Sequence, residues 1–421
     1  MSLDLDLIRS YFPALQGEWT FMDNAGGSQT LKPVADRISD YLLNTNVQHG
    51  ASYAVSQRGM RRVQVATEAM ATLVNAPDPQ SIVMGPSATA LFRILSLCLS
   101  RLWQPGDEVI VTNTDHEANV SPWTDLQRHG IEVKTWRANP ETLRLELEDL
   151  EALMSERTRL VAVTHTSNLL GTLNPIRRFA DHVHQRGALI AVDGVAHAPH
   201  RLVDVQALNV DFYVFSFYKV YGPHYALMYG RKDLLIEMPG LNHYFIDGEQ
   251  VPYKFQPGNV NFELAYGVAG IADYLSDVAR AHFSGSHRTL REEMRLTFDL
   301  FTEHEERLSE RLLDFLQTHP AVRIIGEKTA DAQRRVPTVS FVVEGMDSKN
   351  IVDRIDPFRI GIRYGDFYAK KLIEDLGLVE QNGVVRVSLV HYNTLDEVDR
   401  LISAFEETGL LKGSPSTNSS R

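Results

Sequence analysis

The stretch that decides the fold is ALIAVDGVAHAPHRLVDVQALNVDFYVFSFYKVYGPH, residues 188–224. Its two apolar runs, at 188–193 and 212–217, are typical of strands that are buried on both faces of a sheet. Asp193 ends the first run, and Lys219 follows the second. Because an unpaired charge costs several kcal/mol to bury, each side chain needs a partner, solvent or a covalent bond.

Lys219 stands among aromatic residues, in FSFYKVYGPH. Its amine can reach solvent along the apolar stem, pair with a carboxylate, or lose its charge through a shifted pKa or a covalent bond. Asp193, which precedes Gly194, can equally be a turn or capping residue. Taken alone, neither residue distinguishes a structural role from a chemical one.

Short apolar runs alternate with amphipathic stretches from about residue 80 to 230. This alternation predicts a mainly parallel α/β sheet, whose ligands gather at the carboxyl ends of the strands. The predicted strands are 81–85, 107–112, 131–136, 159–165, 188–193 and 212–217, and the predicted helices are 89–102, 147–157 and 175–187.

The chain changes character after about residue 270, where a long polar helical region over 287–319 precedes four shorter strands. This pattern predicts a second, smaller α+β domain. The strands are expected at 322–327, 338–343, 361–365 and 384–390. The expected divisions are an N-terminal arm (1–25, part of the small domain), a large domain (26–275), a small domain (276–412) and a disordered tail (413–421).

Composition argues against several classes of partner. The 421 residues contain 42 Lys and Arg against 54 Asp and Glu, with no dense basic block, so neither nucleic acid nor an anionic membrane is expected to bind. The sequence shows no signal peptide and no membrane helix, and we expect a cytoplasmic protein. The one cysteine, Cys98, is predicted on the apolar stripe of a helix with Leu102, which leaves no thiolate cluster, and no metal site is predicted.

Two further strand ends carry polar residues that suit one ligand. After the first predicted strand, Ser87, Ala88 and Thr89 begin a helix whose N–H groups and hydroxyls suit a phosphate. His116 follows the next strand, where it can stack on a flat ligand, cap a helix or lie at the surface. A phosphate site, a stacking ring, a strand-end carboxylate and a buried lysine together match the requirements of pyridoxal 5'-phosphate (PLP).

The order and wording of these motifs resemble the class V aminotransferases of PLP fold type I, and within them the cysteine desulfurases. The resemblance spans nearly the whole chain. It is carried by FMDNAGGSQ (21–29), GPSAT (85–89), DHEANVSPW (115–123), SNLLGTLNPI (167–176), AVDGVAHAPH (191–200), VDVQALNVDFYVFSFYKVYGP (203–223) and VRVSLVHYNTLDEVDRL (385–401). It implies a mainly parallel seven-stranded sheet, a PLP-dependent enzyme acting on a small amino acid, and a homodimer with shared active sites.

The resemblance gives most of these motif residues a role at the cofactor. Lys219 is implied to form the Schiff base and to move the α proton, His116 to stack on the ring, and Asp193 to pair with the ring nitrogen. The other implied cofactor contacts are Ser87, Ala88, Asn168, Ser216 and, in the neighbouring subunit's phosphate site, Asn259. Two further expected contacts depart from the family pattern: Tyr218 stands where desulfurases usually have His, and His197 follows Ala196, which stands where they carry a Gln.

The substrate side departs from the desulfurase pattern. The resemblance assigns Arg386 to the substrate carboxylate, with Asn24 and Arg363 as further substrate contacts. In desulfurases a loop cysteine takes the substrate sulfur as a persulfide. The corresponding loop here is RYGDFYA (363–369), with Tyr368 in the place of that cysteine. Because a phenol cannot accept sulfur as a persulfide, desulfuration of that kind is not expected.

The expected reaction is β-elimination. PLP stabilises the carbanion that forms when the α proton is removed. With Lys219 as the base, a cysteine-type or S-conjugated substrate would lose its sulfur group and yield pyruvate and ammonia. His116, Tyr368 and Arg363 complete the expected catalytic set, with Tyr368 and Arg363 orienting or protonating the leaving group.

Two alternatives stay open at this point. Epimerases related to the desulfurases also lack the loop cysteine, so epimerisation, or transamination, of an amino acid is the first alternative. A PLP-binding protein without catalysis is the second, although the retained Lys219, Asp193, His116 and Arg386 argue against it. The sequence does not name the substrate.

Overall fold

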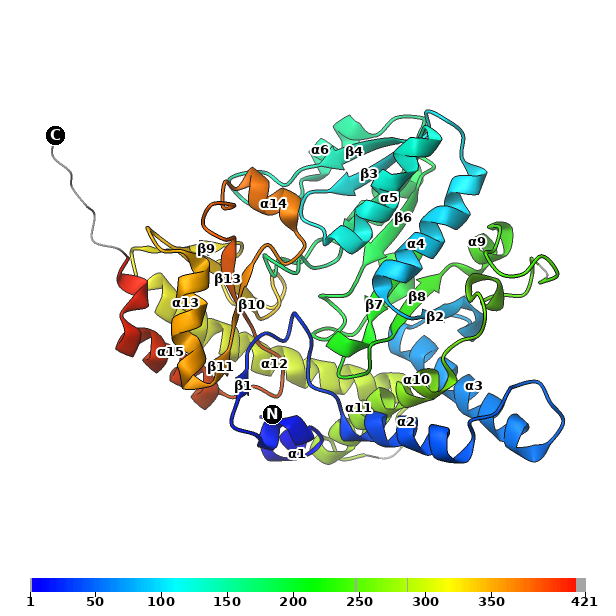
Figure 1. Cartoon of the computed structure of the whole chain (residues 1–421), viewed down its shortest axis with the longest axis horizontal. Coiled ribbons are helices and arrows are strands. Elements are labelled where there is room, and N and C mark those ends of the chain that lie inside the picture. Colours follow the sequence, from blue (N-terminus) through cyan, green and yellow to red (C-terminus); the bar gives the residue numbers. More distant parts are fainter. Residues whose placement is uncertain (1, 247, 286, 414–421) are drawn as a thin grey trace.

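The fold is given by a computed structural model that describes residues 2–246, 248–285 and 287–413. Figure 1 shows two groups of strands, with the long helix α12 (Leu290–Gln317) running beneath both. The tail predicted over 413–421 lies outside the described residues from residue 414 onward.

The larger group of strands is a seven-stranded sheet with the order β2-β8-β7-β6-β5-β3-β4. Its members are β2 (Ile82–Gly85), β3 (Glu108–Thr112), β4 (Glu132–Trp136), β5 (Thr158–Thr164), β6 (Leu189–Asp193), β7 (Phe212–Ser216) and β8 (Ala226–Gly230). Strand β8 is antiparallel to both of its neighbours, and the other pairings are parallel. The predicted α/β fold with a mainly parallel sheet is therefore confirmed.

Apolar cores cover both faces of this sheet, which explains why its strands read as continuous apolar runs. In β5, Val161 and Val163 pack into one core, whereas Leu160 and Ala162 between them pack into the other. Helices α3, α7, α11 and part of α12 contribute to the first core, and α4 contributes to the second. The bounds of these helices are α3 (Ala54–Val74), α4 (Ala88–Leu99), α7 (Ile176–Gln185) and α11 (Ala269–His282).

Cys98 lies on the buried face of α4, as predicted, together with Leu91 and Leu95. The prediction was wrong for Leu102, whose side chain is 46% exposed. The α-helix ends at Leu99, and a short 3₁₀ turn (Ser100–Leu102) then directs the chain out of the core.

The smaller sheet has the antiparallel order β12-β13-β10-β9. Its strands are β9 (Val322–Ile325), β10 (Thr338–Val343), β12 (Arg363–Gly365) and β13 (Val384–Ser388). Helices α13 (Ser348–Ile355) and α15 (Leu395–Thr408) bury their apolar sides against it. The predicted strand at 361–365 is divided, because β11 (Ile360–Gly361) pairs instead with the N-terminal β1 (Thr20–Phe21).

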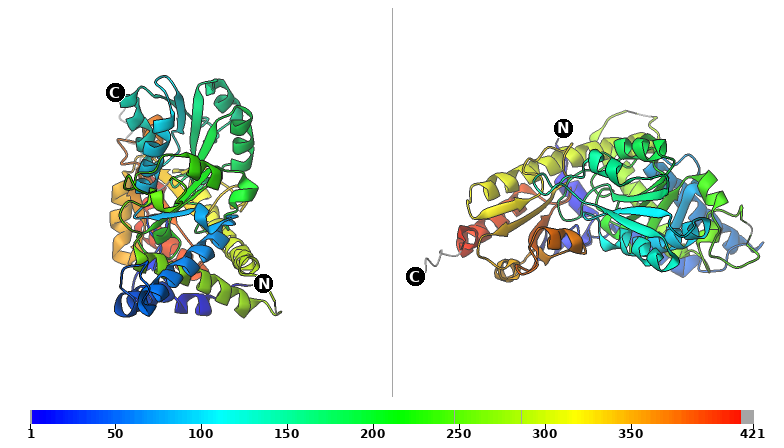
Figure 2. Two further views of the ribbon diagram at one scale, coloured as in Figure 1. Left: turned by 90° about the vertical axis from the view of Figure 1, so that its right-hand side faces the viewer. Right: turned by 90° about the horizontal axis from the view of Figure 1, so that it is seen from above.

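Helix α12 joins the two units, as Figure 2 shows from above. It begins with a capping box in which Thr289 and Glu292 bond each other's backbone N–H groups, an arrangement that stabilises a helix start. Phe298 in its first half packs into the core of the large sheet, whereas Leu312 in its second half packs into the core of the small sheet. The domain limits set out above stay a prediction.

The remaining α-helices lie mainly at the periphery (Figure 1). They are α1 (Leu5–Ser10), α2 (Lys32–Asn44), α5 (Ser121–Thr124), α6 (Leu147–Leu153), α8 (Val205–Leu208), α9 (Lys232–Glu237), α10 (Phe262–Gly267) and α14 (Lys370–Asp375). Across the described part of the chain, none of the helices combines the length and apolar character needed to cross a membrane. In the same residues, no three His, Cys, Asp or Glu side chains converge as a metal site.

Candidate active site

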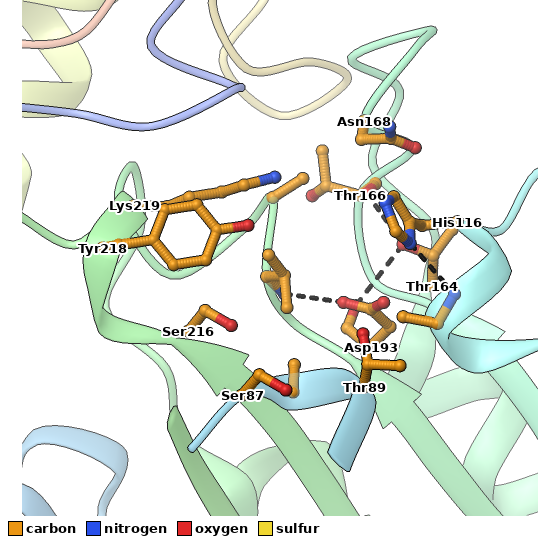
Figure 3. A pocket seen from close by; sticks show the side chains of 14 residues that line it. Ser87, Thr89, His116, Thr164, Thr166, Asn168, Asp193, Ser216, Tyr218 and Lys219 are labelled. Carbon is orange, nitrogen blue, oxygen red and sulfur yellow. Dashed lines mark hydrogen bonds between the residues drawn. The ribbon is translucent and has the colours of Figure 1, made fainter. Parts of the chain in front are cut away.

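A pocket opens where the carboxyl ends of β2, β5, β6 and β7 meet, as expected for a parallel sheet. Figure 3 shows Lys219 and Tyr218 on one side of it, His116 and Asn168 on the other, and Asp193 at its base. The lining residues are Ser87, Ala88, Thr89, His116, Ala118, Thr164, Thr166, Asn168, Asp193, Val195, Ala196, Ser216, Tyr218 and Lys219. The structure therefore brings together eight of the residues that the sequence assigned to a cofactor: Ser87, Ala88, His116, Asn168, Asp193, Ser216, Tyr218 and Lys219.

Lys219 ends the short 3₁₀ turn that follows β7, and only 5% of it is exposed. This burial excludes an amine that extends freely into solvent. Burial and the neighbouring Arg386 guanidinium lower the pKa of the Lys219 amine to about 8, against the opposing effect of Asp193 and Asp23. The amine thus gives up its proton more readily than an ordinary lysine, which suits both Schiff-base formation and proton transfer.

Asp193 is the last residue of β6, and its carboxyl is buried. One oxygen, Oδ1, accepts a hydrogen bond of 2.8 Å from the Val195 N–H. Burial raises the pKa of this carboxyl to about 6, while the Val195 N–H and the Lys219 amine lower it. A cationic N–H at the base of the pocket would hold the carboxyl in its charged form.

The first turn of α4 forms another part of the wall. Ser87 caps the helix through its Oγ, which accepts a hydrogen bond of 3.1 Å from the Ala90 N–H. The N–H groups of Ala88 and Thr89 precede the first carbonyl partners within the helix, and the positive end of the helix dipole lies here. Ser216 lies near Ser87 in Figure 3. These groups together suit an anion such as a phosphate.

His116 both caps a short helix and lines the pocket, so the alternatives left open by the sequence are not exclusive. Its Nδ1 accepts a hydrogen bond of 3.0 Å from the Ala118 N–H. Burial, and to a lesser degree Lys219 and Arg386, lower the pKa of the ring to about 4. A neutral, flat imidazole is therefore presented to the pocket near neutral pH.

Tyr368 lies over the edge of the pocket rather than within it. Its ring stands 5.0 Å from the His116 ring, and its side chain is 64% exposed. The loop is held by its backbone, because the Tyr368 carbonyl accepts from the Glu117 N–H (2.8 Å) and the Phe367 carbonyl accepts from Asn168 Nδ2 (2.8 Å). Phe367 and Tyr368 have φ values of 51° and 60°, in the left-handed region that non-glycine residues rarely adopt.

Arg386 lies beneath this loop and is 2% exposed. Its Nη1 donates to the Asn168 carbonyl (3.1 Å), its Nη2 donates to Asp23 Oδ1 (2.8 Å), and the Phe367 ring centre lies 3.7 Å from the guanidinium carbon. Among the described residues, Arg386 Nε and Asn168 Oδ1 are buried without a hydrogen-bond partner. Because buried polar groups are seldom left unpaired, this region suits a polar ligand, and the fork of Arg386 suits a carboxylate.

Asn24 makes hydrogen bonds within the fold. It is buried, and its side chain joins the N-terminal segment to β13 and to the turn that follows β13 through hydrogen bonds. Its Nδ2 donates to the carbonyls of Phe21 and Ser388 and to Asn393 Oδ1, and its Oδ1 accepts from the Tyr392 O–H. Because Oδ1 can accept a second hydrogen bond, the role of Asn24 as a substrate contact stays a prediction.

His197 and Asn259 also lie outside the pocket. His197 stacks on His165 at 3.5 Å, and its Nδ1 contacts Thr166 Oγ1 at 3.1 Å, so Thr166 stands between this ring and the pocket. His197 is thus absent from the pocket wall, and its role at the cofactor stays a prediction. Asn259 is exposed and borders a separate hollow beside Pro86, and its role toward a second subunit stays a prediction.

Sequence reasoning missed several wall residues and one buried acid. Thr164 and Thr166 line the pocket after β5, and their place at a strand end was the only available signal. Asp115 accepts hydrogen bonds from the Thr112 O–H, from Asn119 Nδ2 (2.7 Å) and from the Thr164 N–H (2.9 Å). Burial, with a smaller contribution from Asp193, raises the pKa of Asp115 to about 8, so it is a neutral acid beneath the pocket wall at neutral pH.

Comparison with known proteins agrees with this arrangement. The sequence model for "Aminotransferase class-V" matches residues 20–299 and 281–401. The chain belongs to the class V aminotransferase family. It is 42% identical over 415 residues to the aminotransferase-like protein FGM3 of Gibberella zeae, covering 96% of this chain and 98% of that one. It is 35% identical over 419 residues to the cysteine desulfurase-like protein ustD of Aspergillus flavus, covering 96% and 90%.

A solved structure of the same family has the same architecture. The cysteine desulfurase CsdA of Escherichia coli superimposes with a TM-score of 0.83 at 27% identity, covering 98% of this chain and 100% of that one. The family assignment confirms the predicted resemblance, a PLP-dependent enzyme of the cysteine desulfurase-like group, and the cofactor. The pocket fits PLP, because the start of α4, the Asp193 carboxyl and the Lys219 amine offer groups for its phosphate, ring nitrogen and aldehyde.

Proposed function

We propose that this class V aminotransferase is a carbon–sulfur lyase that releases the β-substituent of a cysteine-type or S-conjugated amino acid. The observation that carries the proposal is the position of its one thiol. Cys98 is buried in α4 outside the pocket, and burial raises the pKa of the thiol to about 12. Because this thiol is neither accessible nor ionised, the enzyme lacks a group that could take sulfur from a substrate.

The pocket residues divide into cofactor contacts and substrate contacts. In this proposal the start of α4 and Ser216 hold the phosphate, Asp193 holds the ring nitrogen, His116 covers the ring and Lys219 forms the covalent link. PLP supplies the electron sink that makes an α proton of an amino acid removable. Arg386 holds the α-carboxylate, which places the α proton of the substrate toward Lys219.

Lys219 is the base for that proton in the proposed reaction. Its lowered pKa means that more of the amine is neutral at physiological pH than for an ordinary lysine. Tyr368 and Arg363 are both exposed, and in this proposal they orient or protonate the leaving sulfur group. After the sulfur group has left, hydrolysis by water would release the carbon skeleton as pyruvate and its nitrogen as ammonia.

We also propose a cytoplasmic homodimer with shared active sites. Exposed apolar side chains lie on or beside α2 and α3, among them Leu43, Tyr53 and Val65. Asn259 lies exposed beside Pro86, one residue before the proposed phosphate site begins, so a second subunit docked there could meet it. Sedimentation of the holoenzyme tests the dimer, and an Asn259→Ala variant that keeps full cofactor affinity would remove Asn259 from its proposed role.

Product analysis tests the reaction. Holoenzyme is incubated with L-cysteine, L-cystine and an S-alkyl cysteine, and pyruvate, alanine and exchange of the α proton for deuterium are measured. Pyruvate release that is lost in Lys219→Ala supports the lyase. Alanine would indicate desulfuration, and deuterium exchange without a new product would indicate epimerisation, and either outcome would replace the proposal.

A further inference from the structure

Asp23 binds one of the Arg386 N–H groups that a ligand carboxylate would need. Its Oδ1 accepts a hydrogen bond of 2.8 Å from Arg386 Nη2, while Arg386 Nη1 donates to the Asn168 carbonyl at 3.1 Å. The third donor, Nε, is buried and lacks a partner among the described residues. A carboxylate that binds in two-point fashion takes two N–H groups on one edge of the guanidinium. On the Nε–Nη2 edge, one of those groups is free and Asp23 holds the other.

Asp23 is the partner that can move. The other edge of the guanidinium is fixed by the Asn168 backbone carbonyl, and the Phe367 ring covers one face. Arg386 itself is 2% exposed, whereas the Asp23 side chain is 29% exposed. An incoming carboxylate therefore meets Asp23 as its competitor for the same nitrogen.

Arg363 offers a second position for the Asp23 carboxylate. Its Nη1 already forms a loose ion pair with Asp23 Oδ2 at 3.7 Å, and its side chain is 56% exposed, so a small movement would shorten this contact to a direct hydrogen bond. Gly26 lies close against the Asp23 carboxylate, and a Cβ at position 26 would lie 2.7 Å from Oδ2, so a side chain there would collide with it. The carboxylate thus stands between two guanidinium groups, with Oδ1 bonded to Arg386 and Oδ2 facing Arg363.

We propose that Asp23 competes with the substrate carboxylate for Arg386, and that Arg363 takes over Asp23 when the substrate binds. The inference rests on the proposed function, in which Arg386 holds the substrate carboxylate. The exchange keeps a carboxylate on the buried guanidinium in both states, so Arg386 is never left as an unpaired cation. Asp23 would then set how tightly the site holds carboxylates, because the loss of one ion pair offsets part of the gain from the other.

The affinity of the holoenzyme for propionate tests this exchange. Propionate carries a carboxylate but no amine, so it cannot react with the cofactor, and its dissociation constant follows from competition with L-alanine in the cofactor absorbance. Asp23→Asn keeps the size of the side chain and removes its charge, and we expect propionate to bind about tenfold more tightly. Arg363→Gln should weaken propionate binding in the native background and have little effect beside Asp23→Asn, because the two residues act together.

Each result distinguishes the proposed exchange from a simpler role of Asp23 or Arg363. Weaker or unchanged propionate binding in Asp23→Asn would overturn the inference and show that Asp23 only orients Arg386. Equal weakening by Arg363→Gln in both backgrounds would overturn it too, because Arg363 would then contact the ligand directly. Asp23→Ser provides a second neutral variant if the Asn variant does not fold.

Arg386→Lys distinguishes failure of the inference from failure of the proposed function. A lysine cannot offer a two-point fork, so propionate binding should be lost in this variant. Propionate binding that is unaffected by Arg386→Lys would overturn the proposed role of Arg386, and the exchange with it. Lost binding in Arg386→Lys, combined with weaker binding in Asp23→Asn, would overturn the exchange alone.

Discussion

The wall of the pocket and the loop above it are built in different ways. The wall consists of residues at or shortly after the ends of strands of the seven-stranded sheet, such as Asp193 at the end of β6 and Lys219 in the turn after β7. The loop 363–369 comes from the four-stranded sheet and reaches the wall through two backbone carbonyls and the exposed ring of Tyr368. The wall is thus fixed by the main core, whereas the loop depends on contacts between two units.

This difference separates two parts of the chemistry. The wall carries the groups that suit PLP in this family, and we assign to it the removal of the α proton. The loop is where desulfurases place the sulfur-accepting cysteine, and Tyr368 stands there in this chain. We therefore propose that the wall determines the removal of the α proton at the cofactor, and that the loop determines how the substrate reacts afterwards.

Lys219→Ala should cause the largest loss of activity among substitutions in the pocket wall. In the proposed mechanism the amine forms the covalent link and transfers the α proton, so we expect kcat/KM to fall by about 10³-fold or more when it is removed. The absorbance of the Schiff base in the purified protein should disappear as well. Lys232→Ala, at the partly exposed ion pair with Asp78, is the matched control and should keep both properties. Retained turnover in Lys219→Ala would remove Lys219 from the mechanism.

Asp193→Asn tests the electrostatics of the wall. The amide keeps an acceptor for the Val195 N–H but cannot carry the charge that we propose holds the ring nitrogen protonated. We expect kcat/KM to fall by about 10²-fold with an intact fold, together with a change in the pH at which the cofactor absorbance shifts. An absorbance titration and kinetics of one preparation check both. If the cofactor absorbance of Asp193→Asn shifts at the same pH as that of the native enzyme, Asp193 does not contact the ring nitrogen.

Asp115→Asn tests the buried acid beneath the wall through the pH dependence of stability. Its pKa is raised from 3.8 to about 8 in the folded protein, so on raising the pH the unfolded chain loses this proton first. As the pH rises from about 5 to about 7, the free energy of unfolding of the native protein should therefore fall by about 3 kcal/mol relative to that of Asp115→Asn. Urea unfolding of both proteins at the two pH values measures this. A difference that does not vary with pH would mean that Asp115 is ionised in the fold.

Tyr368→Phe and Tyr368→Ala give the smallest effects and separate packing from proton transfer. The ring lies over His116, so its loss in Tyr368→Ala should lower kcat/KM by about tenfold. If the O–H protonates the leaving group, Tyr368→Phe should be impaired for L-cysteine but much less so for a substrate with a better leaving group. Equal activity of Tyr368→Phe and the native enzyme on both substrates would limit Tyr368 to packing.

The parts of the fold that were predictable lie within short stretches of sequence. The apolar runs at 188–193 and 212–217 correspond to β6 and β7, and Ser87 is the N-cap of α4 as its position before an apolar helix suggested. These features follow from local periodicity and capping, which the chain encodes over a few residues. Lys219 and Asp193 were found for the same reason, as charges at the ends of buried strands.

What could not be predicted depends on contacts between distant segments. Asp23 and Arg386 are 363 residues apart in sequence, and nothing near either one indicates their ion pair. The side chain of Asn24 is taken up by Ser388 and its neighbours, and Thr166 separates His197 from the pocket. Motif resemblance placed these residues near the site but could not say which side chains point into it.

The most direct test of the central claim is to follow the sulfur during turnover of L-cysteine. The holoenzyme is incubated with L-cysteine without added thiol, the mass of the intact chain is measured, and released sulfide, pyruvate and alanine are quantified. The account predicts an unmodified chain, with sulfide and pyruvate formed in equal amounts. A persulfide on the chain together with alanine would contradict it, because sulfur would then pass through the enzyme.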